Sequence, residues 1–152
     1  MLLSKATGYG ILALAYLANQ PRNRRCGLEE IAVHEHIPPV FLRKVLGELR
    51  RRRFLRSTKG IHGGYELNRP PETITLWDVV HSLEPDPDFD ACVLGKRICD
   101  SETPCPLHQD WQKVRQHWID LLKTKTILGV AIDAQKLKPA QAGIWDKGRS
   151  TS

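Results

Sequence analysis

Residues 39–51, Pro-Val-Phe-Leu-Arg-Lys-Val-Leu-Gly-Glu-Leu-Arg-Arg, decide the fold of this 152-residue chain. Apolar side chains recur in it at the i, i+3, i+4 and i+7 spacing of an amphipathic helix: Leu42, Val45, Leu46 and Leu49. Pro39 suits the first helical position, where a backbone N–H would lack a helical partner anyway. Arg43 and Lys44 fall on the other faces. We therefore expect a helix with one buried face and one basic, exposed face.

The segments before this helix predict a helix-turn-helix pair. Ser4 is a candidate N-cap for a helix over residues 4–19, and residues 28–34 have the composition of a second, short helix with Glu in its first turn. His36-Ile37-Pro38 then turns the chain. In such a pair the second helix, here residues 39–51, is the one that enters the major groove of DNA.

A basic hairpin is predicted directly after it. Residues 53–57 and 64–68 have the pattern of short strands, and the loop between them contains glycines that permit positive φ. A helix-turn-helix followed by such a hairpin describes a winged helix. The predicted DNA contacts are Val40, Arg43, Lys44, Lys59, Gly60 and His62. The alternative for Lys59 is an ordinary solvated turn residue.

Charge supports an anionic partner for the first half. Residues 1–70 hold 13 Lys and Arg against 5 Asp and Glu, a balance of +8, whereas residues 71–152 hold 10 against 12, a balance of −2. No paired carboxylates, nucleophile beside a base, or Gly-rich phosphate loop indicates an enzyme. We expect double-stranded promoter DNA as the partner, with no small-molecule substrate and no membrane association.

Residues 92–108 gather the predicted metal ligands. Three of the four cysteines lie there, and the candidates Cys92, Cys99, Cys105 and His108 have the spacing C-x6-C-x5-C-x2-H. Thiolates bind iron-sulfur clusters, and this spacing lacks the close C-x2-C pair of zinc ribbons. A structural zinc ion or plain thiols remain the alternatives. The N-terminus lacks signal-peptide features, so we expect a cytoplasmic protein with reduced thiols. Cys26 is left unassigned.

Four segments follow from these patterns. Residues 1–84 form the winged helix-turn-helix domain, closed by a helix that Thr75 and Asp78 cap and that ends near Leu83. Residues 85–105 form a cysteine-rich loop, residues 106–135 a long dimerisation helix with a following segment, and residues 136–152 a mobile tail. The fold class is mainly α with a small β-hairpin wing.

The long helix carries an apolar stripe that predicts a homodimer seam. Its members recur at spacings of 3, 4 and 3: Trp111, Val114, Trp118 and Leu121. The alternative is that these side chains pack on their own domain. The two tryptophans favour an interface.

Several motifs together resemble the bacterial iron-sulfur transcription regulators of the IscR, NsrR and RirA type, over nearly the whole chain. These motifs are Leu3-Ser4-Lys5 leading into Tyr9, Ile37-Pro38-Pro39-Val40-Phe41-Leu42, Lys59-Gly60-Ile61-His62-Gly63-Gly64-Tyr65-Glu66-Leu67, and the three cysteines ending in Cys105-Pro106-Leu107-His108. The resemblance implies homodimers whose promoter binding changes with the state or presence of a cluster.

The resemblance also bears on the fourth ligand. In the IscR branch a histidine three residues after the last cysteine completes a 2Fe–2S site, and His108 stands in that place. In the NsrR branch an acidic residue early in the first helix serves a 4Fe–4S cluster, but residues 5–9 contain no carboxylate. A 2Fe–2S cluster is therefore favoured, with 4Fe–4S as the alternative. Arg43 and Lys44 stand where IscR has an acidic residue and a glutamine that read bases, so the resemblance does not carry the IscR operator over to this chain.

The expected function is that of a transcription regulator, such as a repressor, controlled by an iron-sulfur cluster. A winged-helix regulator that depends on zinc or on cysteine thiols would keep the same fold. A small electron carrier would use the same ligands but would not need a basic helix and wing.

Overall fold

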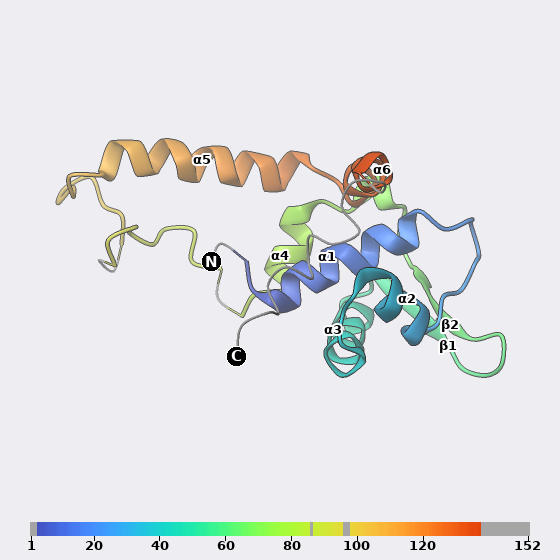
Figure 1. Cartoon of the computed structure of the whole chain (residues 1–152). Helices are drawn as coiled ribbons and strands as arrows, with labels where there is room; N and C mark the ends of the chain where they lie inside the picture. The colour runs from blue at the N-terminus through green and yellow to red at the C-terminus, as the bar shows by residue number, and fades with distance from the viewer. Residues whose placement is uncertain (1–2, 86, 96–97, 138–152) are drawn as a thin grey trace.

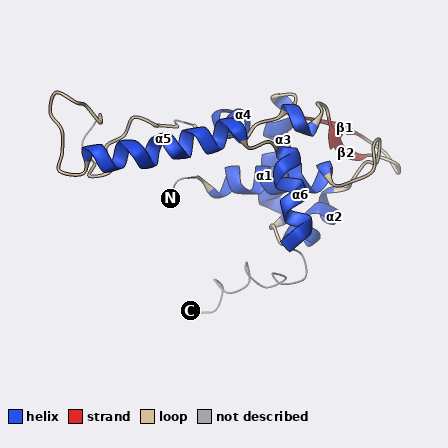
Figure 2. Cartoon of the chain, turned by 90° about the horizontal axis from the view of Figure 1, so that it is seen from above, coloured by secondary structure: helices blue, strands red, loops and turns tan. Residues whose placement is uncertain are grey.

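The structure is a computed structural model that describes residues 3–85, 87–95 and 98–137. The elements follow the chain as α1 (Lys5–Ala18), α2 (Leu28–Glu35), α3 (Pro39–Arg51), β1 (Leu55–Thr58), β2 (Gly64–Leu67), a 3-10 turn η1 (Pro71–Thr73), α4 (Leu76–Leu83), α5 (His108–Thr124) and α6 (Ile127–Leu137). Figure 1 shows α1 to α4, the hairpin and α6 gathered in one body, from which α5 projects as an arm. The view from above shows the same projection (Figure 2).

The helix-turn-helix pair forms as predicted. Helix α2 ends at Glu35, its C-cap His36 has a left-handed φ of 54° that reverses the chain, and Ile37 is buried at 2% exposure in the turn. Pro39 occupies the first turn of α3. The four apolar side chains that predicted this helix are buried: Leu42, Val45, Leu46 and Leu49. Helix α3 therefore packs with its apolar face on α1 and turns its basic face outward.

The hairpin has an antiparallel register that runs from Leu55 opposite Leu67 to Thr58 opposite Gly64. Leu55 and Phe54 are buried at 2% exposure each, which joins the base of the hairpin to the core. Because side chains alternate between the two faces of a strand, a slip of one residue would expose Leu55. The mainly α fold with a small wing is thus confirmed.

Helix α1 is the centre of the core. Ser4 caps its first turn by accepting a hydrogen bond of 3.2 Å from the Thr7 N–H. A Cβ on Gly10 would lie 2.4 Å from a Leu83 methyl, so the small residue allows α4 to approach α1 closely. The capping box of α4 between Thr75 and Asp78 also forms as predicted.

Helix α6 was not predicted as a separate element. It packs along α1, with Ile127 and Ala131 fully buried, and Asn19 donates a hydrogen bond of 3.1 Å to the Ala131 carbonyl. The helix continues through residues 136 and 137, the first two of the predicted mobile tail. The burial of Ile127 and Ala131 against α1 stabilises α6 as a helix. Residues 138–152, the rest of that prediction, lie outside the described residues.

Helix α5 begins at His108, two residues later than expected from Pro106. The His108 N–H donates a hydrogen bond of 3.0 Å to the Cys105 carbonyl, which closes a turn before the helix starts. None of the helices in the described ranges is both long and apolar enough to span a membrane.

Candidate functional site

The outward face of α3 presents positive charge to solvent. Arg43 and Lys44 are exposed, and within the described part of the chain neither side chain forms an ion pair. Arg51 and Arg52, by contrast, both pair with Glu48 near the end of the helix. The two cations nearest the start of α3 are therefore available to an anionic partner. Val40, in the first turn, is 69% exposed beside them.

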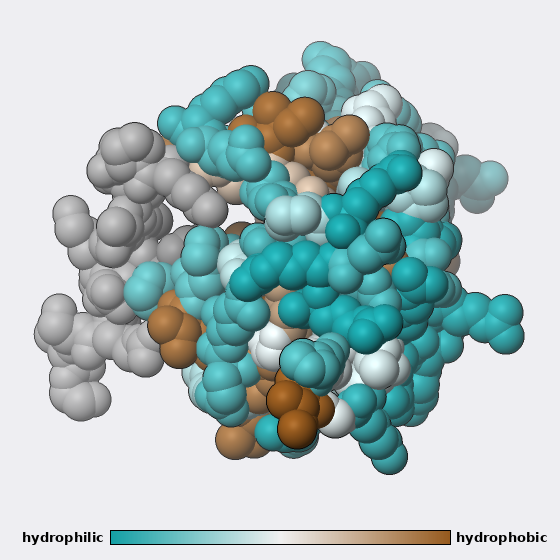
Figure 3. Space-filling view, turned by 90° about the vertical axis from the view of Figure 1, so that its right-hand side faces the viewer, coloured by the Kyte–Doolittle hydropathy of each residue, from teal (hydrophilic) through white to brown (hydrophobic). Residues whose placement is uncertain are grey.

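The wing ends in a tight turn of fixed shape. The Gly63 N–H donates a hydrogen bond of 2.9 Å to the Gly60 carbonyl, which places Ile61 and His62 at the corner. Gly60 has a φ of 103°, and a Cβ on Gly63 would lie 2.1 Å from the Thr58 carbonyl oxygen. Glycine is therefore required at both positions. Figure 3 shows that the face with the hairpin is mostly hydrophilic.

All six predicted DNA contacts are exposed, on α3 or in the wing turn: Val40, Arg43, Lys44, Lys59, Gly60 and His62. Ile61, which the prediction left out, is 99% exposed at the tip. Arg50 donates a hydrogen bond of 3.2 Å to the Ser57 hydroxyl and so connects the end of α3 to β1. The six residues thus lie on two elements, α3 and the wing, that this bond connects.

Cys26 has a structural place in this domain. It forms an isolated bridge with Tyr65 through two backbone hydrogen bonds of 2.9 and 2.8 Å, which adds a third backbone segment beside the wing. Its side chain is fully buried, and burial raises the pKa of the Cys26 thiol. Arg24 donates to its sulfur at 3.2 Å. Cys26 is remote in sequence from the other three cysteines and belongs to the core.

The four predicted metal ligands lie in two close pairs. The Sγ atoms of Cys92 and Cys105 are 4.0 Å apart, and both residues are buried at 8% exposure. The Cys99 Sγ lies 3.3 Å from His108 Nδ1, and this pair is partly exposed. Within the described residues, no group of three or more His, Cys, Asp or Glu side chains is arranged to hold a metal ion. The expected convergence of all four ligands on one point is therefore not seen.

The donor chemistry of the pairs nevertheless fits a cluster. Two sulfurs bound at about 2.3 Å to one tetrahedral metal ion lie about 3.8 Å apart, close to the separation of Cys92 and Cys105. Each iron of a 2Fe–2S cluster takes two protein ligands, which matches two pairs of soft donors. All four cysteines are thiols, so each can supply a thiolate.

Two contacts attach the cysteine-rich loop to α5, and a backbone hydrogen bond closes the loop on itself. The Trp111 indole N–H donates a hydrogen bond of 2.9 Å to the Ala91 carbonyl, next to Cys92. The Cys99 N–H donates a bond of the same length to the Asp90 carbonyl. Arg115 Nη1 lies 3.6 Å from the Asp90 carboxylate, too far for a hydrogen bond but close enough for charge attraction. The loop therefore folds back along the arm.

The same loop also contacts α4. The Phe89 ring stacks on Trp77 with centroids 4.9 Å apart and lies 5.4 Å from the His81 ring. Lys123 of α5 sits over the Trp77 ring at 4.7 Å. The prediction missed this stack, although an aromatic residue within an acidic, proline-rich loop was a signal that could have marked Phe89.

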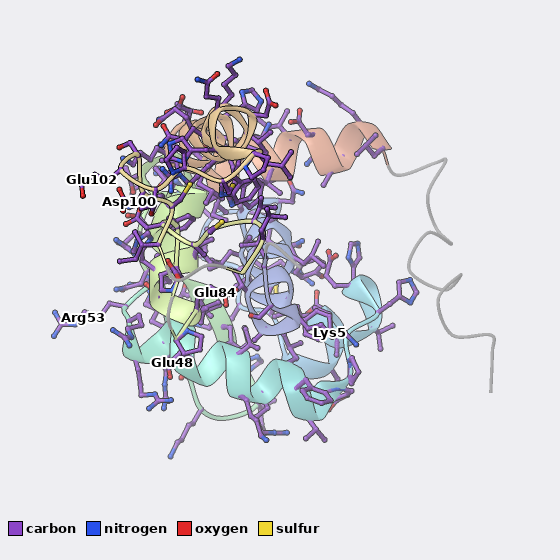
Figure 4. All side chains as sticks on the ribbon, turned by 90° about the vertical axis from the view of Figure 1, so that its left-hand side faces the viewer. Lys5, Glu48, Arg53, Glu84, Asp100 and Glu102 are labelled. Atoms are coloured by element: carbon purple, nitrogen blue, oxygen red, sulfur yellow. The ribbon has the colours of Figure 1, made fainter. Side chains whose placement is uncertain are left out.

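Glu84 connects the start of the loop to α1. Its carboxylate accepts a hydrogen bond of 2.8 Å from the Ser4 N–H and one from the Thr7 hydroxyl. Burial disfavours the charged form, but these hydrogen bonds outweigh it and lower the pKa of Glu84. In Figure 4, Asp100 and Glu102 lie on the outer side of the loop, whereas Glu84 lies further in, beside the ribbons of the body.

The apolar stripe of α5 is only partly covered. Val114 is 56% exposed and Leu121 41% exposed, whereas Leu122 is fully buried against the body. Trp111, Val114 and Trp118 line one side of a cavity of about 310 Å³, and Val80 and Phe89 line the other. The chain alone does not fill this space.

Comparisons with known proteins agree with this architecture. A protein of Aquifex aeolicus (strain VF5) named as an HTH-type transcriptional regulator is 36% identical over 129 residues, which cover 84% of this chain and 89% of the relative. The structure of T. potens IscR matches with a TM-score of 0.68 and 25% identity over 94% of this chain and 95% of that one.

CymR (YrzC), the global cysteine regulator of B. subtilis, matches with a TM-score of 0.71 and 22% identity, over 85% of this chain and 95% of that one. At this identity the likeness supports the fold alone. The model of the Rrf2 family, described as iron-dependent transcriptional regulators, matches residues 3–132. These relatives are regulators and not enzymes. The chain belongs to the Rrf2 family and is a transcriptional regulator with a winged-helix fold.

Proposed function

We propose that this regulator binds promoter DNA as a homodimer and that an iron-sulfur cluster controls the binding. The observation that carries the proposal is that Cys92 pairs with Cys105 and Cys99 pairs with His108 at the start of α5, while the loop with the three cysteines contacts both α4 and α5. A 2Fe–2S cluster is favoured because two donor pairs suit two iron ions. The 4Fe–4S type is the alternative.

DNA recognition rests on the basic surface of α3 and the wing. Arg43 and Lys44 are exposed and unpaired within the described residues, so they can donate to base edges or phosphates in the major groove. Lys59, Gly60 and His62 lie in the wing turn, where a cation and backbone N–H groups suit phosphates or the minor groove. Val40 supplies an apolar contact beside the two cations.

Dimerisation rests on α5. Its exposed apolar stripe and the half-open cavity beside Val80 and Phe89 offer a surface that a second copy of α5 would cover. Two recognition helices in a symmetric dimer reach half-sites about 34 Å apart, or a multiple of that distance. The spacing between these helices is then the property that a signal can change.

The coupling between the two functions follows from the loop contacts. A bound cluster supplies a redox-active and chemically labile centre that joins four side chains. Cys92 lies three residues after Phe89, which stacks on α4, and Cys105 lies three residues before the first residue of α5. Ligation therefore connects the DNA-binding domain to the dimerisation arm. Releasing the ligands frees the loop between them and changes how the two arms orient the two domains.

The test is anaerobic purification followed by visible absorption, iron and acid-labile sulfide assays, and promoter binding of the loaded and cluster-free forms. We expect a coloured protein with iron and sulfide in equal amounts and with different DNA affinities in the two forms. Replacing His108 by Ala should change the absorption spectrum, and the matched change His117→Ala, at an exposed position further along α5, should not. A colourless protein with stoichiometric zinc would overturn cluster control and leave a zinc-dependent regulator.

A further inference from the structure

The three cysteines of the loop differ in their burial and in the side chains that they contact. Cys92 and Cys105 face each other at 4.0 Å between sulfurs and are both buried. Cys99 is more exposed and contacts the imidazole of His108 instead. Cys26 lies in the core of the winged-helix domain beside Arg24. Of the described cysteines, Cys92 and Cys105 therefore have the shortest path to a covalent bond.

We propose that Cys92 and Cys105 form an intramolecular disulfide when the cluster is absent, while Cys99 stays a thiol. The inference rests on the proposed function only in that the same side chains serve as cluster ligands. A hydroperoxide is a sufficient oxidant. One thiolate attacks its outer oxygen, which gives a sulfenic acid and releases an alcohol, or water when the oxidant is hydrogen peroxide; the second thiolate attacks the sulfenic sulfur and releases water. Two thiols are oxidised and one peroxide bond is reduced.

The local backbone permits this bond. The two sulfurs must approach from 4.0 Å to the disulfide distance of about 2.05 Å. Cys92 and Cys105 both lie in irregular backbone, outside any helix or strand, so the approach breaks no regular hydrogen-bond ladder. Both residues keep 8% exposure, so a small hydroperoxide reaches them more easily than a bulky external thiol does, which favours an internal partner over a mixed disulfide.

The disulfide has a consequence for regulation. It would join Cys92, in the first half of the loop, to Cys105, three residues before α5 begins, and cluster ligation would join the same two places. The oxidised protein would therefore keep the loop attached to the arm but would have lost two of its four ligands. Such a protein cannot take up a cluster until a dithiol reduces it, which adds a third, locked state to the regulator.

Peptide mapping tests the proposal on the full-length, cluster-free protein. The protein is prepared by anaerobic chelation, oxidised with hydrogen peroxide, alkylated and digested. Trypsin cleaves after Lys96 and Arg97, between Cys92 and Cys99. Cys99 and Cys105 share a tryptic peptide, and cleavage after Glu102 by a glutamyl endopeptidase separates them. We expect linked Cys92 and Cys105 peptides as the main oxidised product, with Cys99 and Cys26 alkylated.

Two variants complete the test. Cys99→Ser should form the disulfide as readily as the natural chain, whereas Cys105→Ser should form none of it, with circular dichroism to verify that both are folded. A disulfide that contains Cys99, a dimer linked between chains, or three alkylated loop thiols after oxidation would overturn the proposal. The outcome is independent of iron: a protein that binds only zinc and still forms this disulfide would overturn cluster control and leave the inference standing.

Discussion

The carboxylate of Glu84 accepts a hydrogen bond of 2.8 Å from the backbone N–H of Ser4, across 80 residues of sequence. Ser4 caps α1, and Glu84 directly follows α4, so this bond joins the first helix of the DNA-binding domain to the start of the cysteine-rich loop. An N–H at the start of a helix has no helical partner, and the adjacent helix N-terminus favours a negative charge. Glu84 therefore fixes where the loop leaves the body.

Replacing Glu84 by Ala should lower the free energy of unfolding by about 1 to 2 kcal/mol, because it leaves the Ser4 N–H and the Thr7 hydroxyl without this acceptor. The pKa of Glu84 is lower in the folded protein than in the unfolded chain. Its contribution is complete above the unfolded-state pKa and disappears as the pH falls through the folded-state pKa. Urea denaturation between pH 3 and 7 should reveal this loss, and Glu84→Gln should reduce it. Glu72→Gln, which changes an exposed carboxylate, should keep the full loss, and an equal reduction in that variant would contradict the assignment.

Replacing Phe89 by Ala should weaken the communication between loop and DNA-binding domain. The ring stacks on Trp77 of α4 with centroids 4.9 Å apart. We expect the variant to keep its cluster, while the difference in promoter affinity between the loaded and cluster-free forms shrinks. Fluorescence anisotropy with labelled promoter DNA measures both affinities. Val93→Ala, a change of an exposed residue in the same loop, should keep the full difference. An unchanged difference in the Phe89 variant would exclude the stack as the route.

Local patterns predicted the elements whose partners are near in sequence. The four buried side chains of α3 repeat at helical spacing, and Thr75 with Asp78 marks a helix start, so both helices could be recognised without tertiary information. Helix α6 has no comparably clean polar face. Its stability comes from the burial of Ile127 and Ala131 on α1, more than 100 residues away, and that contact is invisible in a local pattern.

Local sequence patterns also could not predict how the residues of the candidate site are arranged. Spacing alone indicated Cys92, Cys99, Cys105 and His108 as ligands, but not that they separate into a buried pair and a partly exposed pair. The structural place of Cys26 depends on its backbone bridge to Tyr65, which follows it by 39 residues. The stack of Phe89 on Trp77 likewise depends on how the loop folds back.

Replacing Arg43 and Lys44 together by Ala should abolish specific promoter binding and leave the cluster absorbance intact. Both side chains are exposed on α3, far from the loop cysteines in sequence. Each base contact contributes about 1 to 3 kcal/mol. The promoter affinity of the double variant should therefore fall by at least about tenfold, and we expect a fall of roughly 100-fold or more. Lys136→Ala is the charge control, because α6 lies on the opposite side of the body from α3 (Figure 1). Normal promoter binding by the double variant would show that α3 is not the recognition helix.

Replacing Val114 by Glu should convert a dimer into monomers. Val114 is 56% exposed on the apolar stripe of α5 and lines the cavity beside Phe89, so a carboxylate there is tolerated in the single chain but is buried in a helix-to-helix interface. Light scattering after size-exclusion chromatography measures the mass of each species. Lys113→Glu makes the matched change at the neighbouring exposed position, off the stripe, and should stay dimeric. Because one recognition helix holds only one half-site, the monomeric variant should also lose most of its promoter affinity while keeping its iron content. A dimer that survives in Val114→Glu would assign the interface to a surface other than this stripe.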